Sequence, residues 1–288
     1  MIAAFVRSLV AGAVVSGTPL LYATLAEVLG QRVGVVNLGL EGVMLMGAVV
    51  GFVTTVQTGS AAVGVLAAAL AGAVFNALFA WLVIDRRANQ LATGLALMFG
   101  GVGLSALIGV RYIGRPVAGL PELAVPGLAS IPVLGPALFA HDALVYAAVP
   151  VAVAVWWAMF KTRWGLAVRA VGEHPVAAFA AGRSPRALQY QALLLAGLLV
   201  GIAGAHLSIG VAKTWAEWMT AGRGFIAVAL VVFARWQPLR AIAGAFLFGG
   251  AISLQLQLQA RGVPVSPFVL DMLPYLLSLA VLAAWGGM

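Results

Sequence analysis

The sequence has no cysteine and few charged residues, and each shortage excludes a class of protein. Without cysteine, the chain can form neither a disulfide nor a thiolate metal site. Charged residues make up only 8% of the chain, against about 25% in soluble domains. Because 63% of the residues are hydrophobic, the composition predicts a protein that lies in a lipid bilayer.

Signals of catalysis are also scarce. The three histidines, His141, His174 and His206, fall in different segments, and there is no Ser-His-Asp set or paired acidic motif. Residues 210–214 come nearest to a phosphate-binding loop, but they lack the glycine before Lys213 and the strand-to-helix context. We therefore expect no enzyme activity, no metal site and no cofactor bound by this chain itself.

Apolar runs of about 20 residues recur along the whole chain, and each is long enough to cross a bilayer. They predict an all-α, polytopic transmembrane helical bundle that forms a single domain over residues 1–288, without a cleavable signal. We expect about nine spans, including broken or short ones: 9–28, 35–57, 61–84, 89–111, 143–160, 187–211, 224–234, 241–258 and 268–285. The pairs Gly47/Gly51 and Gly197/Gly201 would permit close approach of helices.

The net charge of +8 comes from basic residues in short loops between the apolar runs. This pattern is typical of cytoplasmic loops and anionic lipid contact, so we do not expect nucleic-acid binding. Placing Arg86, Arg87 and the basic segment 161–186 in the cytoplasm makes segment 111–142 external. The same assignment predicts an external N-terminus and a cytoplasmic C-terminus.

The most informative stretch is 35–51, an apolar run that contains Asn37 and Glu41. Four residues apart on a helix, these two side chains would lie on one face, which Met44 continues. Insertion of an ionisable group into an apolar segment costs about 2.5–3.5 kcal/mol, so such a group usually faces a partner or a cavity. Glu41 could pair with an arginine and hold helices together, or lie beside a solute path; we favour the path.

Two further features carry polar groups into apolar surroundings. Asn89 and Gln90 open the fourth span, and their amides are candidates for the same path. Residues 222–238 contain a short apolar helix between Gly222 and Pro238, with Arg223 and Phe225 at its start. Transporters place such broken helices beside their solute path, although an ordinary short, tilted span would look similar.

Segment 169–183 is predicted to form a short amphipathic helix in the cytoplasm. Pro175 suits its first turn, Glu173 favours the positive end and Gly182 fits the stop. Val176, Phe179 and Ala180 would form an apolar face. This face could lie on the membrane surface, but we favour docking into a groove of a soluble partner.

Four stretches carry a resemblance to a known family: GVVNLGLEGVMLMGA (34–48), IPVLGPALFAHDALVY (131–146), TRWGLAVRAVGEHPVAAFAAG (162–182) and MTAGRGFIAVALVVFARWQP (219–238). The chain resembles permease subunits of bacterial ATP-binding-cassette (ABC) importers, in the branch shared by branched-chain amino acid, simple sugar and nucleoside systems. It looks most like the nucleoside-type, basic-membrane-protein-associated permeases. It departs from their pattern at His174, where a small polar residue is usual, and at Arg235, where glycine is frequent.

The resemblance implies a permease subunit of an ATP-driven importer for a small polar solute, either nucleosides or purines, in the bacterial cytoplasmic (inner) membrane. It implies an ATPase subunit that uses the ATP, a second permease subunit in a heterodimer, an extracytoplasmic solute-binding protein and contact with membrane lipid. The implied coupling residues are Gly172, Glu173, His174, Pro175, Val176, Ala177, Ala178, Phe179 and Gly182. The candidate path residues are Asn37, Glu41, Met44, Asn89, Gln90, Arg223 and Phe225. The alternatives are a simple sugar permease of the same type and a secondary transporter that acts alone.

Overall fold

The computed structural model describes residues 2–132, 134–263 and 265–285, and almost all of its secondary structure is helical. The elements are α1 (Ile2–Arg32), α2 (Leu40–Thr58), α3 (Ala61–Ala80), η1 (Trp81–Asp85), α4 (Gln90–Gly109), η2 (Val110–Tyr112), β1 (Glu122–Ala124), α5 (Leu134–Phe139), β2 (Ala140–Asp142), α6 (Ala143–Lys161), α7 (Arg163–Glu173), α8 (Pro175–Ala180), α9 (Pro185–Ala205), η3 (His206–Val211), α10 (Arg223–Phe233), α11 (Pro238–Ala260), α12 (Pro267–Asp271) and α13 (Leu273–Trp285). The prediction of an all-α polytopic bundle is therefore confirmed.

Seven helices in the described residues are long and apolar enough to cross a membrane: α1, α2, α3 with η1, α4 with η2, α6, α9 with η3, and α11. Two apolar segments are shorter, α10 and the region 268–277. The expected number of about nine spans agrees with this count when the short segments are included. Both η1 and η3 are π-helical, a form that often occurs at functional sites.

Polar side chains set where several helices begin. The Asp142 carboxylate accepts hydrogen bonds from the backbone N–H groups of Leu144 and Val145 at the start of α6. The Thr162 hydroxyl caps α7, and Ser184 caps α9 immediately before a proline in its first turn. These caps satisfy N–H groups that have no partner inside the helix.

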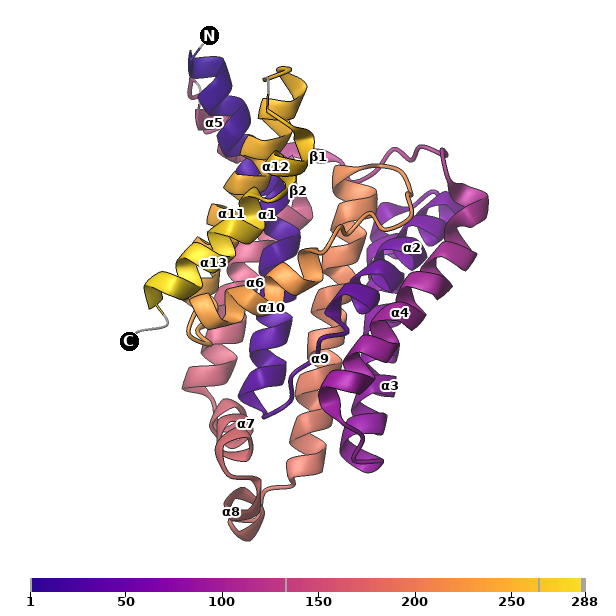
Figure 1. The fold of residues 1–288 in the computed structure, drawn as a ribbon, viewed down its shortest axis with the longest axis vertical. Helices are drawn as coiled ribbons and strands as arrows, with labels where there is room; N and C mark the ends of the chain where they lie inside the picture. The colour runs from indigo at the N-terminus through magenta and orange to yellow at the C-terminus, as the bar shows by residue number, and fades with distance from the viewer. Residues whose placement is uncertain (1, 133, 264, 286–288) are drawn as a thin grey trace.

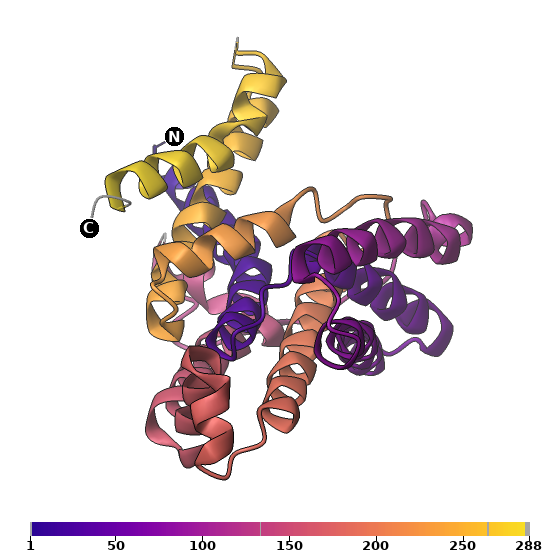
Figure 2. The ribbon, with the colours of Figure 1, turned by 60° about the horizontal axis from the view of Figure 1, so that its bottom comes forward.

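α9 is the central helix of the bundle. It packs against α1, α2 and α3, and Figure 2 shows it between the helices near α1 and the group formed by α2, α3 and α4. A Cβ atom added at Gly47 would lie only 2.6 Å from the Cα of Gly201, and one at Gly201 would lie 2.9 Å from the Cα of Ala69. The small residues therefore allow these helices to approach as closely as the sequence predicted.

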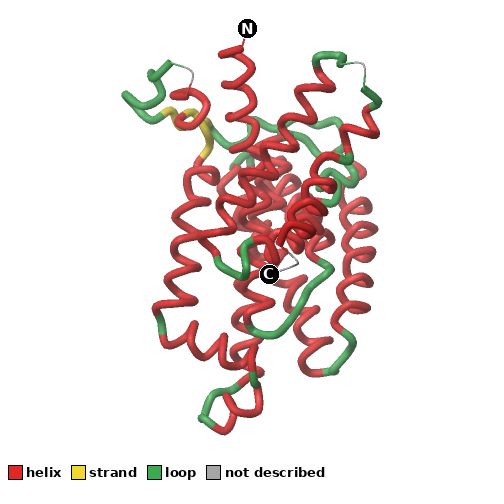
Figure 3. The backbone as a smooth tube through the Cα atoms, turned by 60° about the vertical axis from the view of Figure 1, so that its left-hand side comes forward, coloured by secondary structure: helices red, strands yellow, loops and turns green. Residues whose placement is uncertain are grey.

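The two ends of the bundle differ. α7 and α8 project from the lower end in Figure 1, whereas the N-terminus and the small ribbon of β1 and β2 lie at the opposite end. Figure 3 shows α8 and its flanking loops as the part that extends farthest from the bundle. The antiparallel ribbon pairs Leu123 with His141 inside segment 111–142, the segment predicted to be external.

Candidate functional site

The α1–α2 connector, residues 33–39, rises from the lower end of α1 to the start of α2 (Figure 1). Asn37 lies in it and is buried. Its Nδ2 donates to Oδ1 of Asn76 at 2.8 Å, and Nδ2 of Asn76 donates to the Leu193 carbonyl at 2.7 Å. The Asn37 backbone N–H donates to Glu27 of α1 at 3.3 Å. Asn37 therefore joins the connector to α1, α3 and α9.

The expectation that Asn37 and Glu41 share one helical face is wrong. α2 begins only at Leu40, because the Oδ1 atom of Asn37 accepts the N–H of Gly39 at 2.8 Å. This local bond closes a turn that competes with the helix, as asparagine side chains often do. Glu41 lies in the first turn of α2, and Met44 follows one turn later; both side chains are fully buried.

The Glu41 carboxylate holds the start of α10. It accepts hydrogen bonds from the N–H groups of Gly222 at 2.8 Å and Gly224 at 2.6 Å, and from the Thr220 hydroxyl. Among the described residues, neither of the two ion pairs within 4 Å involves Glu41, so its direct partners are backbone and hydroxyl donors and not an arginine. The carboxylate instead receives backbone donors at the positive end of a helix, where an anion is favoured.

The other predicted path residues lie at two places. The Asn89 carboxamide caps α4 by accepting from Ala92, and the Gln90 Oε1 atom accepts the N–H of Val36 in the connector at 3.0 Å. Arg223 and Phe225 lie in the first turn of α10, next to the residues that Glu41 binds. The structure thus brings Glu41 and Arg223 into one region, and it places Asn89 at an exposed helix end.

The predicted amphipathic helix over 169–183 is two helices. α7 ends at Glu173, and α8 begins at Pro175. His174 separates them, and its Nδ1 atom accepts the N–H of Ala177 at 3.2 Å, so it caps α8. Glu173 therefore ends α7 and does not lie in the first turn of a helix. Gly182, with φ of +77°, follows α8 as the expected stop.

α8 presents an apolar surface to its surroundings. The side chains of Val176 and Phe179 are 71% and 69% exposed, while Ala178 between them is buried. Ala177 lies beside them on the exposed surface, and Ala180 is also exposed. Apolar side chains that project so far from the bundle indicate that something else covers them.

α7 packs directly on the α1–α2 connector. A Cβ atom added at Gly172 would clash with the carbonyl oxygen of Arg32, and it would lie 3.1 Å from the backbone N of Gly34. The Arg32 and Arg169 guanidinium groups lie 5.5 Å and 5.0 Å from the centre of the Phe160 ring. A movement of α7 must therefore displace the connector, because the two backbones are in contact.

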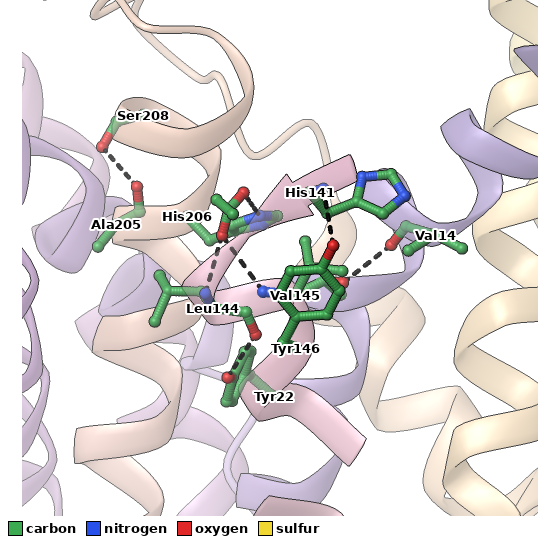
Figure 4. Close-up of polar contacts among 11 residues, drawn as sticks. Val14, Tyr22, His141, Leu144, Val145, Tyr146, Ala205, His206 and Ser208 are labelled. Carbon is green, nitrogen blue, oxygen red and sulfur yellow. Dashed lines mark hydrogen bonds and ion pairs between the residues drawn. The ribbon is translucent and has the colours of Figure 1, made fainter. Parts of the chain in front are cut away.

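Sequence reasoning missed a polar cluster at the end of the bundle opposite α8, shown in Figure 4. His206, fully buried in η3, lies 3.2 Å from the Asp142 carboxylate, and Tyr22 of α1 donates to the Leu144 carbonyl at 2.8 Å. Burial acts to raise the pKa of Asp142, but the hydrogen bond and charge of His206, with the Val145 and Leu144 amides, hold that pKa below its ordinary value. No spacing in the sequence links these residues, since 64 positions separate Asp142 from His206.

The described residues contain no group of three His, Cys, Asp or Glu side chains that could hold a metal ion. Among the side chains that the structure describes, two acidic ones, Glu27 and Glu41, are fully buried, and each already accepts hydrogen bonds. Glu27 accepts from Gln31 at 2.8 Å and from the Asn37 backbone, and Glu41 accepts from the start of α10. These carboxylates position the α1–α2 connector and the start of α10.

Comparison with known proteins identifies the chain as a transporter subunit. Residues 8–282 match the branched-chain amino acid transport system / permease component family. A putative glucose ABC transporter permease protein of Haloferax volcanii is 38% identical, over 91% of this chain and 81% of that protein. A nucleoside ABC transporter permease protein of Lactococcus lactis and a guanosine ABC transporter permease protein of Bacillus subtilis are each 33% identical, over 97% of this chain and 92% of theirs.

The matched residues 8–282 include the α1–α2 connector, the α7–α8 segment and α10. Together with seven apolar helices long enough to cross a membrane, the matches establish a multi-pass membrane protein. The chain belongs to the family of permease components of branched-chain amino acid transport systems, and it is a subunit of an ABC transporter.

Proposed function

We propose that the chain is the permease subunit of an ATP-driven importer for nucleosides or purine bases in the bacterial cytoplasmic membrane. The observation that carries this proposal is the similarity along 97% of the chain to two permeases named for nucleosides and guanosine. The buried carboxamides and carboxylates around the α1–α2 connector fit a path for a polar, uncharged solute, because few fixed charges oppose its passage.

α7 and α8 are the proposed docking segment for an ATPase subunit, which supplies the energy that this chain cannot. The exposed Val176 and Phe179 side chains support docking of α8 into an apolar groove of that subunit. The residues proposed for this contact are Gly172, Glu173, His174, Pro175, Val176, Ala177, Ala178, Phe179 and Gly182. The His174 cap preserves α8, although the family usually has another residue there.

The proposed route of coupling follows backbone contacts from one end of the chain to its interior. α7 contacts the connector at Gly172, the connector leads into α2, and Glu41 of α2 holds the start of α10. Closure of the ATPase subunits would move α7 and so bias α10 between two arrangements. A bias between two discrete arrangements is what coupling requires physically.

Partners complete the proposed assembly. A second, related permease subunit forms the path together with this chain, and an extracytoplasmic binding protein delivers the solute.

The α8 end faces the cytoplasm, and the ribbon of β1 and β2 faces outward. The C-terminus lies on the cytoplasmic side. The basic side chains of Arg86, Arg87 and Arg183 lie exposed in segments assigned to the cytoplasmic side, in accord with the positive-inside rule.

A sugar is the second candidate solute, because the relative from Haloferax volcanii with 38% identity is named for glucose. The two candidates are separated by uptake of radiolabelled guanosine and glucose into proteoliposomes that contain the complete complex. The proposal expects ATP-dependent uptake of guanosine that excess unlabelled glucose does not inhibit. ATP-dependent uptake of glucose alone would make this a sugar permease.

A further inference from the structure

A cavity of about 600 Å³ lies between α10, α11 and α13. Its volume falls within the range of about 300–1,000 Å³ usual for small-molecule sites. Three aromatic and two polar side chains are prominent in its wall: Trp218, Phe225, Tyr275, Arg223 and Gln255. Two of them, Arg223 and Phe225, are predicted path residues, so the cavity adjoins the region that Glu41 organises.

Arg223 lies in the cavity wall and is held there by hydrogen bonds to the backbone that precedes it. Its Nη1 atom donates to the carbonyl oxygens of Met219 at 3.2 Å and Thr220 at 3.0 Å. Its Nε atom is buried and has no hydrogen-bond partner, and no carboxylate of the described residues lies within 4 Å of the guanidinium. A buried guanidinium without a carboxylate partner is unfavourable, so the cavity suits a ligand whose acceptor atoms can pair with it.

Part of the backbone in the cavity wall is held in an uncommon conformation. Trp218 and Ala221 have φ angles of 56° and 47°, in the left-handed region that side chains other than glycine and asparagine rarely adopt. Gly222 has φ of 78°, and a Cβ atom there would come within 2.5 Å of the Tyr275 hydroxyl. The Tyr275 hydroxyl donates to the Ala221 carbonyl at 3.4 Å, which joins α13 to the linker between η3 and α10, residues 212–222. Backbone strain of this kind concentrates at ligand sites.

We propose that this cavity binds the base of a purine nucleoside, a planar nitrogen heterocycle. The ring stacks on the aromatic side chains of Trp218 and Phe225, and the Arg223 guanidinium donates to N7 or O6 of the purine. Aromatic side chains stack on every base, and arginine is the usual donor to these two purine atoms. This inference rests on the proposed nucleoside transport and adds the place where the base is held.

The location also gives the site a way to release its ligand. Gly222 and Arg223 form part of the cavity wall, and Gly222 is bound by the Glu41 carboxylate. A shift of α2 therefore moves one wall of the cavity relative to α11 and α13. The affinity for the base then differs between the two arrangements of the permease, which is what vectorial transport requires.

The test compares tryptophan substitutions in proteoliposomes that contain the complete complex. Trp218→Leu removes the stacking surface, and Trp157→Leu is the matched control, because Trp157 is a 59% exposed tryptophan of α6 outside the cavity. Loss of one stacking partner is expected to lower the initial rate of guanosine uptake by about tenfold. The Trp157 variant should keep the wild-type rate. Phe225→Leu, which preserves an apolar side chain in α10, provides a second variant if Trp218→Leu does not assemble.

A photolabel locates the site without relying on a variant. 8-Azidoadenosine should label residues 218–225 or Tyr275 of the wild-type complex, and excess guanine but not ribose should prevent the labelling. Equal guanosine uptake by the Trp218 and Trp157 variants, or labelling elsewhere, would show that the cavity does not bind the base. The proposed function would not be affected by either result. A wild-type complex that imports glucose and no nucleoside would overturn both proposals.

Discussion

At the scale of single residues, Glu41 shows how hydrogen bonds from another segment of the chain can satisfy a buried carboxylate without a direct ion pair. The backbone N–H groups of Gly222 and Gly224 and the hydroxyl of Thr220 all donate to it. The sequence revealed that Glu41 needed a partner, because an isolated charge in an apolar run is unfavourable. It could not reveal which partner, since the donors are two backbone groups and a hydroxyl some 180 residues away in the chain.

Glu41→Gln should impair transport and weaken the start of α10. The glutamine oxygen can replace one carboxylate oxygen, but its NH₂ group then faces an N–H group of Gly222 or Gly224. Leaving that buried donor unpaired costs about 1–3 kcal/mol. Thermal unfolding and ATP-dependent uptake measure the two effects, with Glu217→Gln in the exposed linker as the control. Uptake equal to that of the control would assign Glu41 no part in transport.

Asp142→Asn tests the polar cluster in Figure 4 through its dependence on pH. The folded-state pKa of Asp142 is lowered, so its carboxylate stabilises the folded chain above the ordinary pKa of about 3.9. This contribution is lost as the pH falls through the lowered folded-state pKa. The variant should therefore be less stable than wild type by about 1–3 kcal/mol at pH 7, and the difference should shrink below about pH 4.

Thermal unfolding of the purified chain from pH 3 to pH 8 measures this difference. Glu122→Gln, an exposed carboxylate of β1 at the same end of the bundle, should change stability little at any pH. If the stability of the Asp142 variant were lower than that of wild type by the same amount at every pH, the effect would come from lost packing and not from the carboxylate charge.

At the scale of elements, the sequence predicted the long apolar helices well, because composition and length alone define a span. The predicted helix boundaries were wrong where a single side chain interrupts the hydrophobic pattern of a helix. Asn37 closes a turn with Gly39, so α2 begins later in the chain than predicted. His174 caps α8 and so divides one predicted helix into two. Both breaks depend on a single side-chain hydrogen bond, which hydrophobic periodicity does not register. The predicted short helix at 224–234 agrees closely with α10, since glycine and proline mark its ends.

Gly172→Ala should disturb the contact between α7 and the α1–α2 connector. The added methyl group would clash with the Arg32 carbonyl, so α7 must move away from the connector. Overpacking of this kind costs about 1–3 kcal/mol, and ATP-dependent uptake should fall more than the amount of assembled complex. Gly100→Ala in α4 is the control, because a Cβ atom there meets open space. Equal uptake by the two variants would exclude this contact from the coupling route.

At the scale of the whole molecule, the helical bundle has two different ends, and α9 runs between them. The α8 end carries exposed apolar side chains, and the opposite end carries the ribbon and the His206–Asp142 pair. The sequence predicted that segments 161–186 and 111–142 lie on opposite sides of the membrane, because one span, 143–160, separates them. The ribbon itself was not predictable, since its strands are only three residues each.

Membrane topology is testable without removing any native thiol, because the chain has no cysteine. His174→Cys places one thiol at the exposed junction of α7 and α8. A membrane-impermeant maleimide should label it in inside-out vesicles and not in intact spheroplasts. A cysteine at exposed Leu128 should show the opposite pattern. Labelling of position 174 from outside would reverse the proposed orientation.

The central claim is that this permease moves solute only through an ATPase docked on α8. ATP-dependent guanosine uptake into proteoliposomes tests it most directly, using wild type, Phe179→Asp and, as control, Leu128→Asp at the opposite end. The account predicts uptake by wild type and the control only when ATP is present, and none by Phe179→Asp, from which the ATPase subunit should dissociate. Uptake without ATP, or full uptake by Phe179→Asp, would contradict it.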